Sequence, residues 1–417
     1  MKTITIALLL LAATAHAQTN DVSARIDRIL RDVPLIDGHN DLPYQYEARA
    51  KDHLAQIDLR QDQSKLTPPL HTDIPRLRAG RVGAEFWSVY VPTSLKGADA
   101  VRAVLVQIDV VHRIDELYPD TFELARTADD VIRIHRGGKI ASLIGVEGGH
   151  SIGNSLAVLR QLYALGARYM TITHSDNDDF ADSATADPMH NGLTPFGKHV
   201  IVEMNRLGML VDLSHVAPKT MNDVLDLTPA PVIFSHSSTR ALVDHPRNVP
   251  DDVLCRLKEN DGVVMVSFVP TFTSEKVRAH DAAHDAEEAR LKTMDRGQPD
   301  RMKAELAKWE AANPAPRATV KDVADHIDHV AQLAGVTHIG LGSDFDGITS
   351  TVEGLDNVST YPALFAELIR RGYTDEQLEG IAGLNVLRVM HKVEAVAARL
   401  KKERAASDAR IEELDKQ

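Results

Sequence analysis

The chain has 417 residues, a formal net charge of −13 at pH 7 and a single cysteine, Cys255. A charge this negative gives no electrostatic reason to bind nucleic acid or an anionic membrane surface. One cysteine cannot form an intrachain disulfide, so stability must come from a large apolar core, which a chain of this length can build.

Residues 1–17 have the pattern of a secretory signal peptide. A lysine precedes a short apolar segment at residues 4–13, and Ala15 and Ala17 supply the small residues of a cleavage site. The apolar segment is much shorter than the roughly 20 residues of a membrane span, and no other stretch is long and apolar enough. We therefore expect an exported protein without a membrane anchor, most simply in a bacterial periplasm.

Eight short apolar runs then alternate with longer amphipathic stretches. Continuous β-branched runs are typical of buried parallel strands, and their alternation with helical patterns indicates βαβ units. Eight such units predict a closed TIM-type (β/α)₈ barrel, with a doubly wound open sheet as the alternative. The runs are residues 34–37, 84–91, 140–147, 169–174, 210–215, 231–236, 262–268 and 338–344.

Two segments depart from this alternation. Residues 271–317 are highly charged and helix-prone, and they fall between the seventh and eighth runs. We expect a helical insertion beside the rim of the barrel, either a solvated helical hairpin or a lid or subunit contact. Residues 397–417 have the composition of a charged helix or frayed tail. The catalytic barrel domain is therefore placed at residues 24–396.

Histidines and carboxylates end six of the eight predicted strands. In a parallel barrel all these ends open on one face, where active sites lie. Neutral imidazoles and carboxylates are the ligands that Zn²⁺ takes, and two ions can share a bridging carboxylate. Each residue alone has a structural explanation, but their convergence predicts a catalytic metal site. The residues are His39, Asp41, Glu147, His174, His215, His236 and Asp344.

The segments that carry these residues resemble a known family. "LIDGHNDLPY", "GAEFWSVYVP", "SLIGVEGGHSI", "GMLVDLSHV", "PVIFSHSS", "RNVPDDVL" and "GLGSDFDG" are similar, in this order, to motifs of the membrane (renal-type) dipeptidases. That family, M19, contains zinc peptidases with an amidohydrolase-like barrel. The similarity extends from about Val33 to Val393, which is nearly all of the chain after the signal peptide.

The resemblance implies two Zn²⁺ ions in each subunit. His39 and Asp41 would hold one ion, His215 and His236 the other, and Glu147 would bridge them. Asp37 and Asn40 are candidates to orient these ligands, because ligating histidines usually need such partners.

Three further roles follow from the resemblance and fit elementary chemistry. His174 would contact substrate and help to stabilise the oxyanion. Asp344 would take a proton from the water that bridges the metal ions, which leaves hydroxide, and would pass this proton to the leaving amine. Arg247 would grip the terminal carboxylate of a dipeptide, because a guanidinium binds both oxygens of a planar carboxylate. A salt bridge from Arg247 to Asp251 or Asp252 is the structural alternative.

The leading hypothesis is therefore a secreted binuclear zinc metallo-dipeptidase, and a homodimer is expected from the resemblance alone. A metal-dependent deacylase of N-acyl amino acids and a non-catalytic peptide-binding barrel are the alternatives. The insertion is longer than in the animal enzymes, and Val269 stands where those have a tyrosine. These departures leave the preferred dipeptide side chains open.

Overall fold

A computed structural model describes residues 21–415 and shows eight parallel strands closed into a barrel. Each strand pairs with two neighbours, and β9 pairs back onto β1, so the open-sheet alternative is wrong and the (β/α)₈ prediction is confirmed. The predicted signal peptide lies outside the described residues. The barrel strands are β1 (Leu35–Asn40), β2 (Val82–Tyr90), β4 (Ile140–Glu147), β5 (Ala167–Thr171), β6 (Leu210–Asp212), β7 (Ile233–Phe234), β8 (Val263–Ser267) and β9 (Ile339–Gly342).

A ninth strand, β3 (Phe122–Leu124), was not predicted. It pairs with the first three residues of β4, outside the closed ring. Its sequence, Phe-Glu-Leu, is too short and too mixed to form an apolar run. Local sequence therefore carries no signal for it, and its pairing depends on the neighbouring strand.

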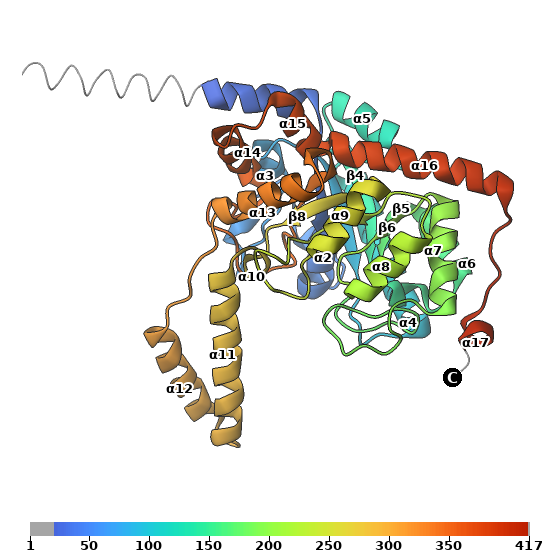
Figure 1. Ribbon diagram of the computed structural model, residues 1–417. Coiled ribbons are helices and arrows are strands. Elements are labelled where there is room, and N and C mark those ends of the chain that lie inside the picture. The colour runs from blue at the N-terminus through green and yellow to red at the C-terminus, as the bar shows by residue number, and fades with distance from the viewer. Residues whose placement is uncertain (1–20, 416–417) are drawn as a thin grey trace, which may run out of the picture.

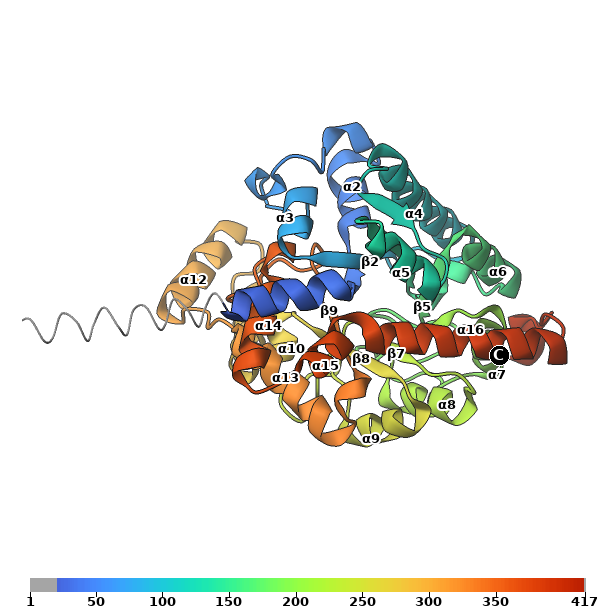
Figure 2. The ribbon, with the colours of Figure 1, turned by 90° about the horizontal axis from the view of Figure 1, so that it is seen from above.

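Helices cover the outside of the barrel (Figures 1 and 2). No helix of residues 21–415 has the length and apolar character that crossing a membrane requires. Besides a helix over residues 21–32, the helices are α2 (Leu42–Ala50), α3 (Ile74–Ala79), α4 (Gly97–Leu117), α5 (Ala128–Arg136), α6 (Leu156–Leu165), α7 (Pro195–Leu207), α8 (Pro218–Leu227), α9 (Asp251–Asn260), α10 (Pro270–Thr273), α11 (Glu275–Met294), α12 (Pro299–Ala312), α13 (Val320–Leu333), α14 (Tyr361–Arg370), α15 (Asp375–Glu379), α16 (Asn385–Glu403) and α17 (Ile411–Leu414).

The sequence explains where the outer helices start and stop. Thr194 caps the first turn of α7 by accepting a hydrogen bond from the backbone of Gly197, and Pro195 occupies the first helical position. Gly208 ends the same helix in a left-handed conformation, with φ of 91°. These local signals set the length of the helix between β5 and β6, and the parallel pairing of the strands brings their carboxyl ends to the same face.

The amino-terminal end of the barrel is closed by α16. Val386, Val389 and Met390 of this helix are at most 3% exposed. They belong to one apolar cluster with strand residues that include Ile36 and Leu143. Burial of this apolar surface leaves the opposite, carboxyl-terminal end of the barrel free to carry polar chemistry.

The predicted insertion between the last two strands is a helical hairpin formed by α11 and α12. Figure 1 shows it projecting from the body of the barrel. Only Val277 and Leu291 of α11 are buried, and α12 has no buried residue. The hairpin is thus largely solvated, and its role as a lid or subunit contact stays a prediction.

The boundary placed after Val396 falls inside α16. Ala397 and Leu400 are buried, so the helix packs on the barrel as far as Glu403. Beyond it, the carboxylate of Asp415 accepts hydrogen bonds from the Phe196 backbone N–H at 3.0 Å and from the Thr194 hydroxyl at 2.5 Å. The charged tail therefore returns to the start of α7, because its acidic end complements the exposed N–H groups of a helix amino terminus.

Candidate metal centre

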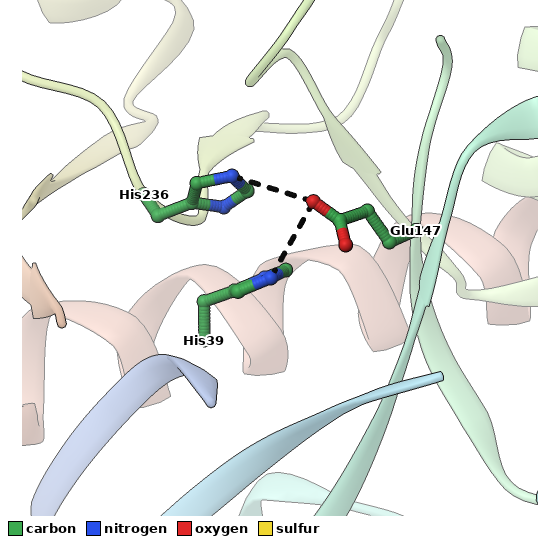
Figure 3. Close-up of side chains that lie close together, drawn as sticks. All are labelled: His39, Glu147 and His236. Carbon is green, nitrogen blue, oxygen red and sulfur yellow. Dashed lines mark ion pairs between the residues drawn. The ribbon is translucent and has the colours of Figure 1, made fainter. Parts of the chain in front are cut away.

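The histidines that end four strands converge on one carboxylate oxygen, Glu147 Oε1. The Nε2 atoms lie 3.5 Å (His39), 3.5 Å (His174), 3.0 Å (His215) and 3.6 Å (His236) from it. Figure 3 shows three of these residues: the rings of His39 and His236 lie next to each other, 3.8 Å between their centres, and both face Glu147. Residues more than 190 positions apart are therefore assembled as the strand pattern predicted.

All seven strand-end residues fall into three overlapping groups whose donor atoms lie within 4.8 Å of one another. The groups are His39, Glu147 and His236; Glu147, His174 and His215; and His39, Asp41 and Asp344. Each has the imidazole and carboxylate donors of a Zn²⁺ site.

The hydrogen-bonding state of these residues fits a bound cation. His39 Nε2 is buried and has no hydrogen-bond partner in the described residues, and the Nε2 atoms of His215 and His236 face each other at 2.9 Å. One carboxylate oxygen cannot satisfy four imidazoles at once. Cations between these nitrogens and Glu147 would give each of them a ligand bond.

The charge states of His215, His236 and Glu147 suit ligation as well. Burial, reinforced by nearby positive charge, holds the pKa of His215 and of His236 well below the usual histidine range. Burial favours the neutral form of Glu147, but His39 and His174 outweigh it and hold the pKa of that carboxyl well below its usual range. Neutral imidazoles and an ionised carboxylate are the forms that bind metals.

Two of the imidazoles are oriented by residues inside the barrel. The hydroxyl of Tyr169 lies 2.8 Å from His39 Nδ1, and its ring covers Gly145, where a Cβ would lie 2.0 Å from Cζ of the tyrosine. His236 Nδ1 lies 2.8 Å from Ser235 Oγ, which donates to Asp212 at 2.6 Å. These partners leave each Nε2 free to face the metal site.

The residues expected to orient the ligands act differently. Asp37 accepts hydrogen bonds from the backbone of Ser343 at 2.7 Å and of His39 at 3.3 Å. Asn40 donates to Thr72 Oγ1 at 2.9 Å. Both therefore fix the backbone around the ligands and leave the imidazole rings to other partners.

Several residues of the site adopt backbone conformations that non-glycine residues rarely take. His215 and Asp344 have φ of 71° and 66°. At Gly347, a Cβ would lie 2.2 Å from Asp41 Oδ2 and 2.6 Å from Asp344 Oδ1, so only glycine fits. Strain of this kind is typical of functional sites, where the surrounding structure holds it in place.

Asp344 lies beside the ligands and is half-buried. Burial, together with the charge of Asp41, raises the pKa of Asp344 to about 8. A carboxyl with its pKa near neutrality can both accept and return a proton.

Arg247 is a buried cation next to the same centre, only 4% exposed. Its guanidinium donates long hydrogen bonds to Ser237 Oγ at 3.4 Å and to the His236 carbonyl at 3.3 Å, and it lies 5.2 Å from the centre of the Phe272 ring. Burial lowers the pKa of Arg247 to about 10, so it is still charged at neutral pH.

The alternative salt bridge of Arg247 is wrong. Asp251 instead lies 2.8 Å from His329 Nε2, and the ion pairs of residues 21–415 include none from Arg247. A buried guanidinium without a carboxylate partner leaves N–H donors for an anionic group of a ligand.

Comparison with known proteins places this site in a family. The family model described as membrane dipeptidase (peptidase family M19) matches residues 23–404. The chain belongs to this family. The predicted resemblance is thereby confirmed over nearly the whole described chain.

Named relatives point the same way. Dipeptidase verJ of Clonostachys rogersoniana is 42% identical over 396 residues, which cover 92% of this chain and 90% of the relative. Dipeptidase tcpJ of Claviceps purpurea is 46% identical over 374 residues, covering 87% of this chain and 77% of the relative. These relatives support hydrolase activity, and together with the ligand clusters they support a metal cofactor.

Solved structures confirm the architecture. The crystal structure of the probable dipeptidase PvdM from Pseudomonas aeruginosa superposes with a TM-score of 0.77 and covers 91% of this chain and all of its own. Its sequence is 23% identical to this one, so the likeness concerns the fold.

Proposed function

We propose that this family member is a secreted binuclear zinc dipeptidase that hydrolyses the peptide bond of dipeptides. The observation that carries the proposal is the convergence of four imidazole Nε2 atoms on Glu147 Oε1, at 3.0 to 3.6 Å. A structural role does not require four imidazoles around one buried carboxylate oxygen, which cannot satisfy all of them.

Five residues would hold the metal ions: His39 and Asp41 on one side, His215 and His236 on the other, and Glu147 between them. Zinc bound there would lower the pKa of a bound water and so supply hydroxide near neutral pH. The contacts of Tyr169 with His39 Nδ1, and of Ser235 with His236 Nδ1, leave the Nε2 atoms free to bind metal.

Arg247 would bind the terminal carboxylate of the substrate. Its charge is buried, it lacks an ion-pair partner in the described residues, and its pKa of about 10 keeps it protonated. A carboxylate clamp at a fixed distance from the metal ligands accepts a dipeptide and excludes a longer chain, whose next residue would occupy the clamp's place. An N-acyl amino acid carries the same terminal carboxylate, so a substrate assay is needed to distinguish a dipeptidase from a deacylase.

Asp344 and His174 would move and balance charge during the reaction. Asp344 accepts the proton of the attacking water and returns it to the leaving amine, so that the peptide C–N bond breaks and a free amino group departs. Burial raises the pKa of Asp344, which suits the return of the proton to the amine, and bound cations would favour the ionised form that accepts it. His174, half-exposed at the mouth, donates a hydrogen bond to the oxyanion that forms on the peptide carbonyl.

Export and dimer formation belong to the same proposal. Export is supported by the signal-peptide pattern at residues 1–17, and the family resemblance supports a homodimer. Sequencing the amino terminus of the secreted protein should find Gln18 first, and light scattering should give twice the mass of one chain. An uncleaved amino terminus would contradict the proposed export, and the mass of a single chain would contradict the proposed homodimer.

Hydrolysis of free dipeptides by the zinc-loaded protein tests the proposed activity. Ala-Ala and Gly-Ala should be cleaved, whereas the matching tripeptides and N-acetyl-alanine should remain intact. Cleavage of N-acetyl-alanine alone would favour the deacylase, and binding of dipeptides without cleavage would favour a non-catalytic barrel.

A further inference from the structure

The turn that presents Asp344 is held in an unusual conformation. Asp344 and Asp346 have φ of 66° and 65°, and Phe345 lies between them. Two left-handed aspartates in three residues are disfavoured unless outside contacts hold them. The placement of the Asp344 carboxyl therefore depends on whatever fixes this turn.

Two backbone hydrogen bonds join the turn to the first ligand segment. Asp344 N–H donates to the His39 carbonyl at 3.0 Å, and Asp41 N–H donates to the Phe345 carbonyl at 2.9 Å. One side of the turn is thus anchored to the segment that carries the ligands His39 and Asp41. These bonds set its position but leave the far side of the turn, at Asp346, to other partners.

One such partner is Gln45, whose Nε2 donates to the Asp346 carbonyl at 2.6 Å, and the other is His71, on the loop before α3. Its backbone N–H donates to Asp346 Oδ1 at 2.7 Å, and Asp346 N–H donates to His71 Nδ1 at 2.9 Å. The ring of His71 also packs 5.6 Å from the ring of Phe345. The side chains of His71 and Asp346 are 11% and 1% exposed, so the reciprocal pair is shielded from water.

The next residue reaches the ligand segment from the same loop. Thr72 Oγ1 accepts from Asn40 Nδ2 at 2.9 Å, and Asn40 Oδ1 in turn accepts from the Leu42 backbone at 3.0 Å. His71 therefore contacts the turn, and Thr72 contacts Asn40 in the segment between His39 and Asp41.

We infer that His71 is a positioning residue for the reaction, which orients Asp344 by holding Asp346 in its left-handed conformation. The inference rests on the proposed role of Asp344. The Nδ1 and N–H hydrogen bonds and the ring contact of His71 are made to Asp346 and Phe345, so its effect passes through the turn. Loss of its Nδ1 acceptor would leave the Asp346 N–H unpaired and would let the turn relax away from the ligands.

Two substitutions at this position separate the acceptor from the volume. In His71→Asn the side-chain oxygen can take the place of Nδ1 as acceptor, whereas His71→Leu fills the space without an acceptor. For Ala-Ala hydrolysis, we expect His71→Leu to lower kcat about 10- to 100-fold with KM within about twofold, and His71→Asn to keep at least about a third of kcat. Both variants should retain two zinc ions per chain.

Asp346→Gly provides a second route to the same test. Glycine adopts the φ of 65° without strain and keeps the N–H that donates to His71 Nδ1, but it offers no oxygen to the His71 N–H, so kcat should fall by less than in His71→Leu. His338→Leu is the matched control. This buried histidine lies before β9, and its Nδ1 is 2.8 Å from the Gly262 carbonyl rather than near the metal ligands. It should change the melting temperature and leave kcat unaltered.

A crystal structure of His71→Leu decides the inference independently of activity. We expect the backbone of Asp344 to move away from its φ of 66° in this variant. An unchanged backbone conformation of Asp344 would overturn the inference. Equal kcat values in His71→Leu and His71→Asn would also overturn it, as would a loss of zinc in proportion to the loss of kcat. A wild type that cleaves no dipeptide would instead overturn the proposed function and leave the crystallographic outcome to judge the role of His71.

Discussion

The two ends of the barrel bury opposite kinds of side chain, apolar at one end and polar at the other. At the amino-terminal end, Val386, Val389 and Met390 of α16 pack with strand residues in an apolar cluster and are almost completely buried. At the carboxyl-terminal end, one buried ring nitrogen of His39 and one of His215 lack hydrogen-bond partners in the described residues, and His215 has a strained backbone. The same strands run through both ends.

The difference shows where stability and chemistry are separated in this chain. Apolar burial at the closed end contributes favourable free energy that offsets the cost of uncompensated polar groups at the open end. Substitutions at the open end should therefore change metal binding and turnover, whereas substitutions at the closed end should change stability alone. The following predictions sharpen or break this division.

The largest effect is expected for Glu147→Gln. An amide cannot bridge two cations, so the variant should lose at least one zinc ion, and its kcat/KM for Ala-Ala should fall by about 10³-fold or more. Metal analysis and a dipeptide assay measure both. Glu123→Gln, a surface substitution, is the control and should match the wild type. Full zinc content with full activity in Glu147→Gln would break the account of this end.

Asp344→Asn should separate metal binding from proton transfer. The amide keeps the shape of the side chain but cannot carry the proton, so we expect two bound zinc ions and a kcat lowered about 10²- to 10³-fold. The measurement is turnover together with metal content on the same sample. A fully active variant would exclude Asp344 as the proton shuttle.

Arg247→Met should affect substrate binding more than metal binding. Loss of a buried charge-assisted contact is worth about 1.5–3 kcal/mol, or roughly 10- to 200-fold in kcat/KM. The loss should appear for Ala-Ala and disappear for Ala-alaninamide, which has no terminal carboxylate to bind. Equal losses for both substrates would contradict the clamp.

Met390→Ala probes the closed end. Removing this side chain, 3% exposed, should lower the free energy of unfolding by about 2–3 kcal/mol through lost burial and a residual cavity. Well below the melting temperature, kcat and zinc content should equal those of the wild type. A large loss of kcat would show that the two ends are coupled.

The smallest effect is a change in the pH dependence of stability at Asp115, far from the metal ligands. Its carboxylate accepts from Ser142 Oγ at 2.6 Å, and burial raises the pKa of Asp115 to about 7. Because the folded-state pKa lies above the unfolded value near 4, stability contributed by this group falls as pH rises from about 4 to about 7.

Asp115→Asn removes that titration. The variant should be more stable than the wild type at pH 8 by about 1–2 kcal/mol, a figure reduced for the water that still reaches this half-buried group, and equal to it near pH 4. Denaturant unfolding at both pH values measures the difference. An identical pH profile in the two proteins would show that Asp115 does not titrate as described.

Much of the fold and of the ligand set could be predicted from the chain. The strands are apolar runs that end abruptly in His, Asp or Glu, and parallel pairing brings such ends to one face. Glu147, His215 and His236 could therefore be assigned to one site although they are far apart in sequence. The short strand β3 could not be predicted, because its three residues of mixed polarity form no periodic hydrophobic pattern.

The residues that orient the site were not predictable, for a physical reason. Tyr169 sits within a buried strand, where an aromatic side chain looks like ordinary core, and its hydroxyl meets His39 only across the closed barrel. His71 lies in a loop whose partner, Asp346, is 275 positions away. Such contacts depend on tertiary geometry that local sequence does not encode.

Zinc titration of the metal-free protein tests the central claim most directly. Ala-Ala hydrolysis should be absent without metal, should rise as zinc is added and should reach a plateau at two equivalents per chain. Hydrolysis that is complete without metal, or a plateau at one equivalent with no further binding, would contradict a two-metal centre built on Glu147.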